Sequence, residues 1–105
     1  MNQTDQVLNL LGLAMRARKI ATGEELVISE IRRKHAKLVI ISNDASENTK
    51  KTIMNKCNSY GVPCVEFESR YMLGYAIGKA ERVSIAILDG GFAKKMQTLI
   101  HELKG

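Results

Sequence analysis

Long apolar runs are absent from this sequence. No window approaches the roughly 20 consecutive apolar residues that a bilayer-spanning helix requires. The opening residues, MNQTDQ, contain neither the basic region nor the apolar stretch of a secretory signal peptide. We therefore expect a cytoplasmic protein without a membrane partner.

Proline and cysteine are also scarce. Pro63 is the only proline, and the two cysteines are Cys57 and Cys64. Cytosolic thiols are kept reduced, so we expect no disulfide, and two cysteines alone are too few ligands for a metal site. We interpret both as buried apolar side chains. The 105 residues, of which 45% are hydrophobic and 26% charged, predict one domain that spans residues 1–105.

The motifs of common enzymes are missing as well. The sequence has no P-loop, no spaced pair of dinucleotide-binding glycines and no nucleophile elbow. His35 and His101 lie in polar helical contexts without metal-ligand spacing, so we interpret them as solvated side chains. We therefore expect no catalytic residue, no metal ion, no cofactor and no small-molecule substrate.

Asp44 is the best candidate for an enzymatic or signalling role. It follows a predicted strand at 38–41, and open α/β sheets bind ligands beyond the carboxyl ends of their strands. A receiver-like phosphoacceptor would also need an acidic cluster after an earlier strand to hold Mg²⁺. Glu24, Glu25 and Glu30 lie instead on a predicted helix, so a turn or helix-cap role is favoured over the phosphoacceptor alternative.

Apolar periodicity predicts alternating helices and strands along the chain. Spacing and cap residues predict five helices, which start near Thr4 or Asp5, at Gly23, after Ser46, after Ser69 and near Phe92. The second helix is expected to reach about Lys34, the third to end before the turn at Tyr60, Gly61 and Pro63, and the fourth to end at Gly78. Short apolar runs predict strands at 20–22, 38–41, 64–67 and 83–88, with a break at Asp89, Gly90 and Gly91.

The strand patterns decide the predicted architecture. The run at 38–41 is apolar without alternation, which is typical of a strand covered on both faces. A helix between the strands at 38–41 and 64–67 implies that these two strands are parallel. We therefore predict an α/β fold, a three-layer α/β/α sandwich with a mixed, mostly four-stranded sheet.

Positive charge predominates, and it is unevenly distributed. The chain has 16 Lys and Arg against 11 Asp and Glu, a net charge of +5, which favours an anionic partner and nucleic acid first. Two short stretches that bracket the second helix hold Arg16, Arg18, Lys19, Arg32, Arg33, Lys34 and Lys37. Cations at the ends of helices also complement the helix dipole, so a purely structural role remains open for them.

Several segments resemble a known family when they are taken in order. They are the string ATGEELVISEIRRKHAKLVIISNDASENTKK, then SRYMLGYAIG, then VSIAILDGG. Together they resemble the bacterial YlxQ-type branch of the superfamily of ribosomal and ribonucleoprotein kink-turn binders. Proteins similar to this one fold as an α/β/α sandwich, have no catalytic activity and bind a sharply bent RNA helix with tandem sheared G·A pairs.

The resemblance also implies an RNA-binding site. In the superfamily the N-terminus of the second helix enters the RNA groove, and a loop before the last strand shields the extruded bases. A helix N-terminus presents free N–H groups, and carboxylates accept hydrogen bonds from guanine. The expected RNA-binding residues are Lys19, Thr22, Gly23, Glu24, Glu25, Ser29, Arg33, Lys79, Ala80, Glu81, Arg82 and Val83.

The chain departs from the family pattern at three points. Glu25, Leu26 and Ser29 align with three polar positions of the motif, but Leu26 cannot hydrogen-bond to a base and Ser29 replaces a lysine. Arg33 matches a recurrent arginine, and Arg16, Lys19 or Arg32 is a candidate to replace the missing cation. The loop at 79–83 is charged where small apolar residues are usual, which suits contacts with phosphates.

We therefore expect a monomeric, non-catalytic protein that binds structured RNA, most simply a kink turn in ribosomal or regulatory RNA, and that associates with the ribosome. The alternative is a protein–protein adaptor in ribosome assembly or translation that retains the fold without specific RNA readout.

Overall fold

Four short strands form one mixed sheet in the order β1-β4-β2-β3. The computed structural model describes residues 1–105 and defines β1 (Ile20–Thr22), β2 (Leu38–Ile41), β3 (Cys64–Glu66) and β4 (Ser84–Ile87). The β4 strand is antiparallel to both of its neighbours, β1 and β2, whereas β2 and β3 are parallel. The predicted mixed sheet and its predicted parallel pair are both confirmed.

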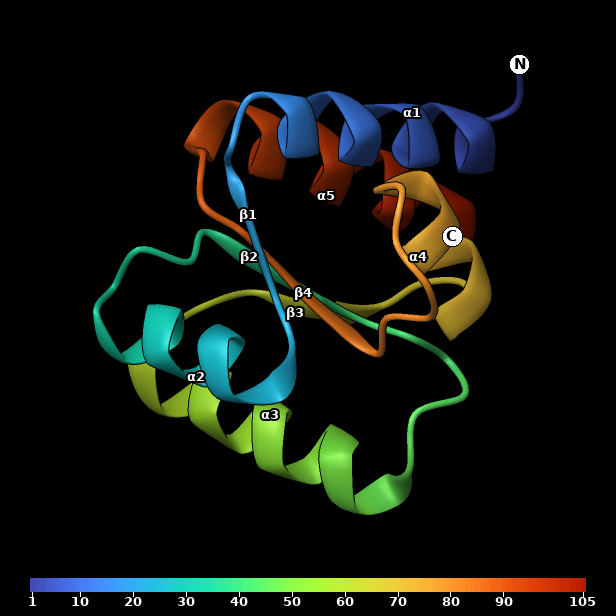
Figure 1. The fold of residues 1–105 in the computed structure, drawn as a ribbon. Coiled ribbons are helices and arrows are strands. Elements are labelled where there is room, and N and C mark those ends of the chain that lie inside the picture. Colours follow the sequence, from blue (N-terminus) through green and yellow to red (C-terminus); the bar gives the residue numbers. More distant parts are fainter.

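Helices cover both faces of this sheet. They are α1 (Gln3–Arg16), α2 (Glu24–Arg32), α3 (Glu47–Tyr60), α4 (Arg70–Ala76) and α5 (Gly90–Lys104). On one face lie α1, α4 and α5, and on the other lie α2 and α3 (Figure 1). The predicted three-layer α/β/α sandwich is confirmed.

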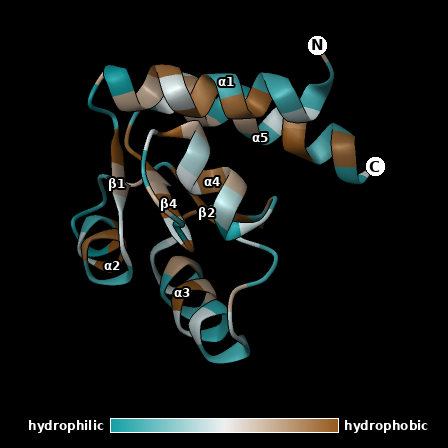
Figure 2. Ribbon diagram, turned by 45° about the vertical axis from the view of Figure 1, so that its right-hand side comes forward, coloured by the Kyte–Doolittle hydropathy of each residue, from teal (hydrophilic) through white to brown (hydrophobic).

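The side chains of the two central strands alternate between two cores. From β2, Leu38 and Ile40 point toward α1 and α5, while Val39 and Ile41 point toward α2 and α3. Every residue of β2 and β4 is buried, and both strands appear largely brown in the hydropathy view (Figure 2). Burial on both faces explains why the run at 38–41 shows no alternation in the sequence.

Side-chain caps begin four of the five helices. Asn2, Ser46, Ser69 and Asp89 each accept a hydrogen bond from a backbone N–H three residues further along the chain. The predicted caps at Ser46 and Ser69 are confirmed, but the cap of α1 is Asn2, earlier than the predicted start at Thr4 or Asp5. These caps satisfy N–H groups that a helix leaves without intrahelical partners.

Several element boundaries differ from the predictions. Strand β4 ends before Asp89, as predicted, but Asp89 caps α5 and both glycines belong to its first turn, so this helix starts earlier than the predicted position near Phe92. Strands β3 and β4 are shorter than predicted, and α3 continues through Tyr60 before Gly61 ends it. The α4 helix ends at Ala76, ahead of Gly78. None of the helices combines the length and apolar character needed to cross a membrane.

Cys57 and Cys64 are free thiols on the α2–α3 side of the sheet. Cys57 is buried, as predicted, whereas Cys64 is only half-buried, because β3 lies at the edge of the sheet. The neighbouring Cys57 thiol and partial burial both raise the pKa of Cys64. The Cys64 thiol therefore stays protonated at neutral pH.

Candidate functional site

One hollow of about 500 Å³ collects residues from four parts of the chain. The end of β1 and the start of α2 contribute three residues, α3 contributes one, and the segment that enters β4 contributes four. They are Thr22, Gly23, Glu24, Thr49, Glu81, Arg82, Val83 and Ser84. Only one of these side chains is hydrophobic, so the hollow suits a polar ligand rather than an apolar one.

Strand pairing brings these segments together. Thr22, the last residue of β1, pairs with Ile85 near the start of β4, and its hydroxyl donates a hydrogen bond to the carbonyl oxygen of Ser84 at 2.9 Å. On the other side of β4, the backbone N–H of Ser42 donates to the carbonyl oxygen of Val83 at 2.8 Å. The end of β1, the start of β4 and the end of β2 thus meet at one end of the sheet.

The start of α2 is the one helix start without a side-chain cap. Its N-cap residue is Gly23, which has a φ of 96° and offers no side-chain acceptor. The first-turn N–H groups therefore lack the acceptor that the other helices provide, and they create positive potential beside the hollow. Glu24 and Glu25 occupy the same turn, and both are exposed. This turn can donate to an anionic oxygen and accept from a polar hydrogen.

The loop before β4 is held against α4. An added Cβ at Gly74 would lie 1.7 Å from the carbonyl oxygen of Ala80. Only glycine at position 74 therefore lets the loop pack this closely against α4. The N–H of Lys79 donates to the carbonyl oxygen of Gly74, and that of Arg82 to the carbonyl oxygen of Arg70, both at 2.9 Å. These contacts hold the loop before β4 in place, and this loop forms the side of the hollow opposite the start of α2.

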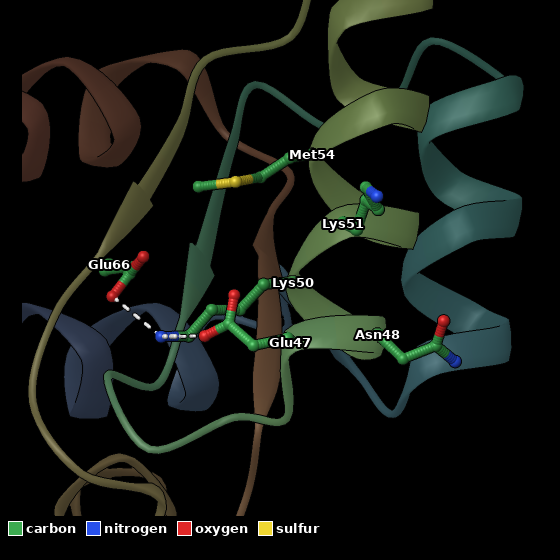
Figure 3. Close-up of a pocket in the computed structure, with 6 residues that line it drawn as sticks. All are labelled: Glu47, Asn48, Lys50, Lys51, Met54 and Glu66. Carbon is green, nitrogen blue, oxygen red and sulfur yellow. Dashed lines mark ion pairs between the residues drawn. The ribbon is translucent and has the colours of Figure 1, made fainter.

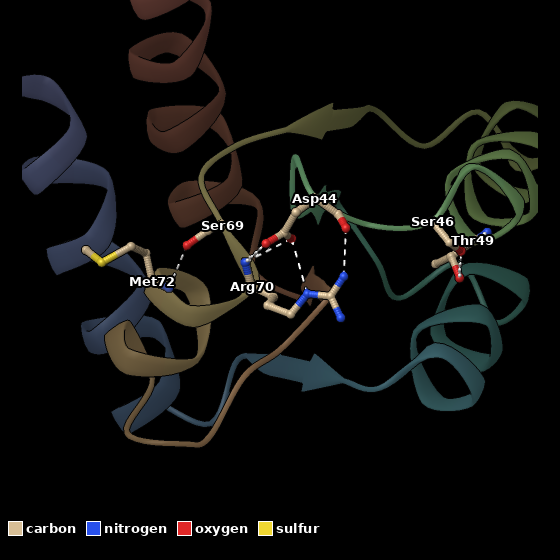
Figure 4. Close-up of polar contacts among 6 residues, drawn as sticks. All are labelled: Asp44, Ser46, Thr49, Ser69, Arg70 and Met72. Atoms are coloured by element: carbon tan, nitrogen blue, oxygen red, sulfur yellow. Dashed lines mark hydrogen bonds and ion pairs between the residues drawn. The ribbon is translucent and has the colours of Figure 1, made fainter.

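A second set of contacts links α4 to the loop after β2 (Figure 4). The Asp44 carboxylate accepts hydrogen bonds from the Arg70 backbone N–H at 3.2 and 3.4 Å, and Nη2 of Arg70 donates to the Asp44 carbonyl oxygen at 2.7 Å. Nε of Arg70 also lies 3.4 Å from Oδ1 of Asp44. Asp44 thus anchors the start of α4, and through α4 it supports the loop that borders the hollow.

The pKa of Asp44 reflects this anchoring. Desolvation raises the pKa, but the nearby Ser42 hydroxyl, the Arg70 backbone N–H and the Arg70 charge together lower it more, so that it lies below its ordinary value. No three acidic, histidine or cysteine side chains gather anywhere in the structure as a metal site would require. The geometry favours the structural interpretation of Asp44 over the phosphoacceptor alternative.

A hollow of similar size lies between α3 and β3 (Figure 3). Its central cation, Lys50, has a side chain that is only 17% exposed and lies 3.3 Å from a Glu66 carboxylate oxygen and 3.8 Å from one of Glu47. Because both carboxylates already neutralise this ammonium group, Lys50 joins α3 to β3 rather than offering a free charge to a ligand.

The predicted RNA-binding residues lie in three places in the structure. Thr22, Gly23, Glu24, Glu81, Arg82 and Val83 line the hollow at the start of α2. Glu25, Lys79 and Ala80 are exposed on the segments that border it, and Ser29 is half-buried one helical turn further along α2. Lys19 and Arg33 are elsewhere, because β1 and α2 carry them to the opposite end of the sheet.

Two residues of the hollow were not predicted. Thr49 is the third residue of α3, and Ser84 is the first residue of β4. Neither carries a motif, and only the pairing of β4 with its neighbours brings them beside Gly23. A signal for Thr49 was nevertheless available, since α3 follows β2 directly and its start must lie near the end of that strand.

Known proteins share this fold and much of this sequence. The model of the ribosomal protein L7Ae/L30e/S12e/Gadd45 family matches residues 5–97. A protein named RNA-binding protein YlxQ from Bacillus subtilis (strain 168) is 55% identical over 91 residues, which cover 87% of this chain and 91% of that one. A protein of the same name from Enterococcus faecium is 52% identical over 95 residues, which cover 90% and 91%.

Solved structures agree with these matches. A protein with unknown function from Bacillus halodurans C superposes with a TM-score of 0.89 at 48% identity, covering 90% of this chain and 96% of that one. The Giardia lamblia 15.5kD RNA binding protein superposes with a TM-score of 0.76 at 21% identity, covering 99% and 90%, and this second likeness concerns the fold alone.

Proposed function

The chain belongs to the ribosomal protein L7Ae/L30e/S12e/Gadd45 family as a YlxQ-type member, and we propose that it is a non-catalytic protein that binds structured RNA. Two relatives that are more than half identical to it are named RNA-binding proteins. The RNA we propose is a kink turn in ribosomal or regulatory RNA, bound in the cytoplasm by a monomer that associates with the ribosome.

The observation that carries this proposal is the meeting of the uncapped start of α2 with the segment 81–84 in one polar hollow. The first-turn N–H groups of α2 suit phosphate or base carbonyl oxygens. Glu24 and Glu25 suit the N1 and N2 donors of guanine, which sheared G·A pairs expose in the groove. One side of the hollow therefore reads bases.

The opposite side of the hollow suits the RNA backbone. Arg82 lines it, and Lys79 lies exposed in the same loop. Neither cation makes an ion pair with a carboxylate of this chain; the Arg82 guanidinium donates to the carbonyl oxygen of Glu81. Cations of this kind orient an RNA by holding phosphates but carry no sequence information. A bent RNA can contact the start of α2 and the cationic loop at the same time, whereas an extended RNA cannot. Binding therefore favours the bent form of the RNA.

A binding titration tests the proposal. The probe is a kink-turn duplex labelled for fluorescence anisotropy, and the matched control is the same duplex with its tandem G·A pairs replaced by Watson–Crick pairs. We expect the first to bind at least tenfold more tightly, since loss of bidentate base contacts costs about 1–3 kcal/mol each. Equal affinities would contradict kink-turn recognition and leave only salt-dependent phosphate binding.

A second candidate function, a protein–protein adaptor in ribosome assembly or translation, has one observation in its favour. Leu26, in the first turn of α2, is 50% exposed next to the hollow, where an RNA-reading residue would be polar. A Leu26→Asn variant separates the two functions. An adaptor would lose its protein partner in nuclease-treated pull-downs while its RNA affinity stayed unchanged. A kink-turn binder would instead bind RNA more tightly, because the new amide can hydrogen-bond to a base edge, and its pull-downs would not change.

A further inference from the structure

A second charged surface lies at the opposite end of the sheet from the hollow. Ile20 of β1 and Leu38 of β2 both pair with Ile87 of β4, one on each side. The residues before them, Lys19 and Lys37, therefore lie on either side of the end of β4. Their backbones are separated from each other by roughly two strand spacings, about 10 Å. The carbonyl oxygen of Lys19 accepts from the Leu88 N–H, and the Lys37 N–H donates to the carbonyl oxygen of Ile87.

Seven cations gather around this point, and we call them the basic end. They come from the ends of α1 and α2, which lie on opposite faces of the sheet, and from the segments that follow (Figure 1). The basic end consists of Arg16, Arg18, Lys19, Arg32, Arg33, Lys34 and Lys37. All seven are exposed, and none makes an ion pair. The acids on the adjoining segments are engaged, Glu30 with His35 and Asp89 with the start of α5.

Two of these cations occupy positions that normally favour glycine. Arg18 has a φ of 61° and Lys34 a φ of 63°, so both adopt the left-handed conformation just beyond a helix end. Backbone hydrogen bonds form a Schellman motif at the end of each helix. In α1 the N–H groups of Arg18 and Lys19 donate to the carbonyl oxygens of Met15 and Ala14. In α2 the N–H groups of Lys34 and His35 donate to the carbonyl oxygens of Ile31 and Glu30. Both helices thus carry a cation where glycine would be less strained.

This repetition suggests a function for the two side chains. A non-glycine residue in the left-handed region is held there at a cost, and such residues cluster at binding sites. A cation in the last turn of a helix interacts favourably with the helix dipole. Arg16 in α1 and Arg32 in α2 already supply this cation, so the dipole does not require Arg18 or Lys34. The strained cations therefore add charge to the surface beyond what the helices need.

We propose that the basic end binds the phosphate backbone of RNA, as a second contact surface about 13 Å from the hollow along β1. This inference rests on the proposed function, since it extends the same RNA beyond the hollow. A phosphate backbone fits better than a protein partner, because the segments 16–19 and 32–37 expose no large apolar side chain, and protein interfaces are centred on such residues. Phosphate binding needs only accessible cations.

The test separates charge from backbone strain. An Arg18→Gly, Lys34→Gly double variant removes two cations and relieves both strained residues. We expect its thermal unfolding midpoint to rise by roughly 4 °C. We expect its affinity for the kink-turn duplex to fall about fivefold to tenfold at 0.15 M salt, and the slope of log affinity against log salt to shrink by about 1.5.

Three further proteins complete the design. Glu68→Gly is the strain control, because Glu68 is the third non-glycine residue with positive φ, at 58°, and it carries no cation. Lys104→Gln is the charge control, since Lys104 lies at the far end of α5 and makes no ion pair. Lys19→Gln with Lys37→Gln removes two cations of the basic end without introducing glycine. We expect the two controls to retain wild-type RNA affinity and the Lys19, Lys37 variant to lose it as the glycine variant does.

The outcomes distinguish this inference from the proposed function. If either double variant keeps the wild-type affinity and salt slope, the basic end does not hold RNA phosphates and the inference is overturned. An acidic protein surface would then be the partner of the basic end. If the wild type fails to discriminate against the duplex without G·A pairs, kink-turn recognition fails. A reduced salt slope of the double variants would then still support phosphate binding at the basic end.

Discussion

Gly74 decides how the loop before β4 lies against α4. Because an added Cβ would meet the Ala80 carbonyl oxygen at 1.7 Å, a Gly74→Ala change must displace the loop or the helix. We expect a loss of about 1–3 kcal/mol in the free energy of unfolding, which is typical of overpacking. We also expect about tenfold weaker RNA binding, because the displaced loop carries Glu81 and Arg82 away from the hollow.

Chemical denaturation and RNA titration of the same Gly74→Ala sample measure the two effects. Gly90→Ala is the matched control, since a Cβ there meets nothing within 4 Å and alanine favours the first turn of α5. If Gly74→Ala weakens folding but leaves RNA affinity unchanged, the loop is not part of the binding surface.

Asp44 makes the stability of the protein depend on pH in the acid range. Its pKa is lower in the folded protein than the value of about 3.9 expected for an unfolded chain. The ionised carboxylate therefore stabilises the fold above about pH 4, and this contribution is lost as the pH falls through the lower folded-state pKa.

An Asp44→Asn variant measures that contribution. The variant should be less stable than the wild type at pH 7, because the amide lacks the charge that Arg70 pairs with. The two stabilities should converge as the pH falls below 4 in urea titrations. A difference that stays constant down to acid unfolding would mean that the charge of Asp44 contributes nothing and that its hydrogen bonds alone anchor α4.

At the scale of the elements, β1 and α2 determine which residues near Gly23 in the sequence lie at the hollow. Residues near Gly23 in the sequence were predicted to share one RNA-binding site. Thr22 and Glu24 line the hollow, whereas Lys19 and Arg33 do not, and the RNA-binding role of all four stays a prediction. Four residues of extended chain and nine of helix each span about 13 Å, so both cations are carried to the other end of the sheet.

The fold was more predictable than the site for a physical reason. Burial on both faces leaves a continuous apolar run, so β2 could be read directly from four consecutive residues. Caps such as Ser46 and Ser69 act on residues three positions away and are also local signals. The hollow instead depends on the register between β1 and β4, segments more than 60 residues apart, and no local pattern encodes it.

The first turn of α2 offers a direct test of base reading by its carboxylates. Glu25→Gln keeps the size of the side chain but removes the charge that would accept from guanine. We expect about tenfold weaker binding to the kink-turn duplex, with a stability loss of no more than about 1 kcal/mol from the helix dipole. Anisotropy titration and thermal unfolding measure the two quantities.

Glu47→Gln is the matched control for Glu25→Gln, because Glu47 is also an exposed first-turn glutamate, in α3. It should reproduce the change in stability without the change in affinity. If both variants lower RNA affinity equally, the effect is one of net charge, and Glu25 does not contact a base.

For the whole molecule, the sheet separates two surfaces of different character. The hollow joins an uncapped helix start to a charged loop, with carboxylates beside N–H donors. The basic end presents seven exposed cations that make no ion pair. One surface is suited to recognition and the other to phosphate binding, and the net charge of +5 arises mainly from the second.

RNA binding at the hollow would change the environment of nearby backbone amides, so their chemical shifts, measured during titration with a kink-turn duplex, show whether the RNA binds there. We predict that the largest shift changes fall on the amides of 22–26, Thr49 and 79–84, with smaller changes at the basic end. Changes confined to the surface between α3 and β3 (Figure 3), with the α2 start and the 79–84 segment unaffected, would contradict RNA binding at the hollow.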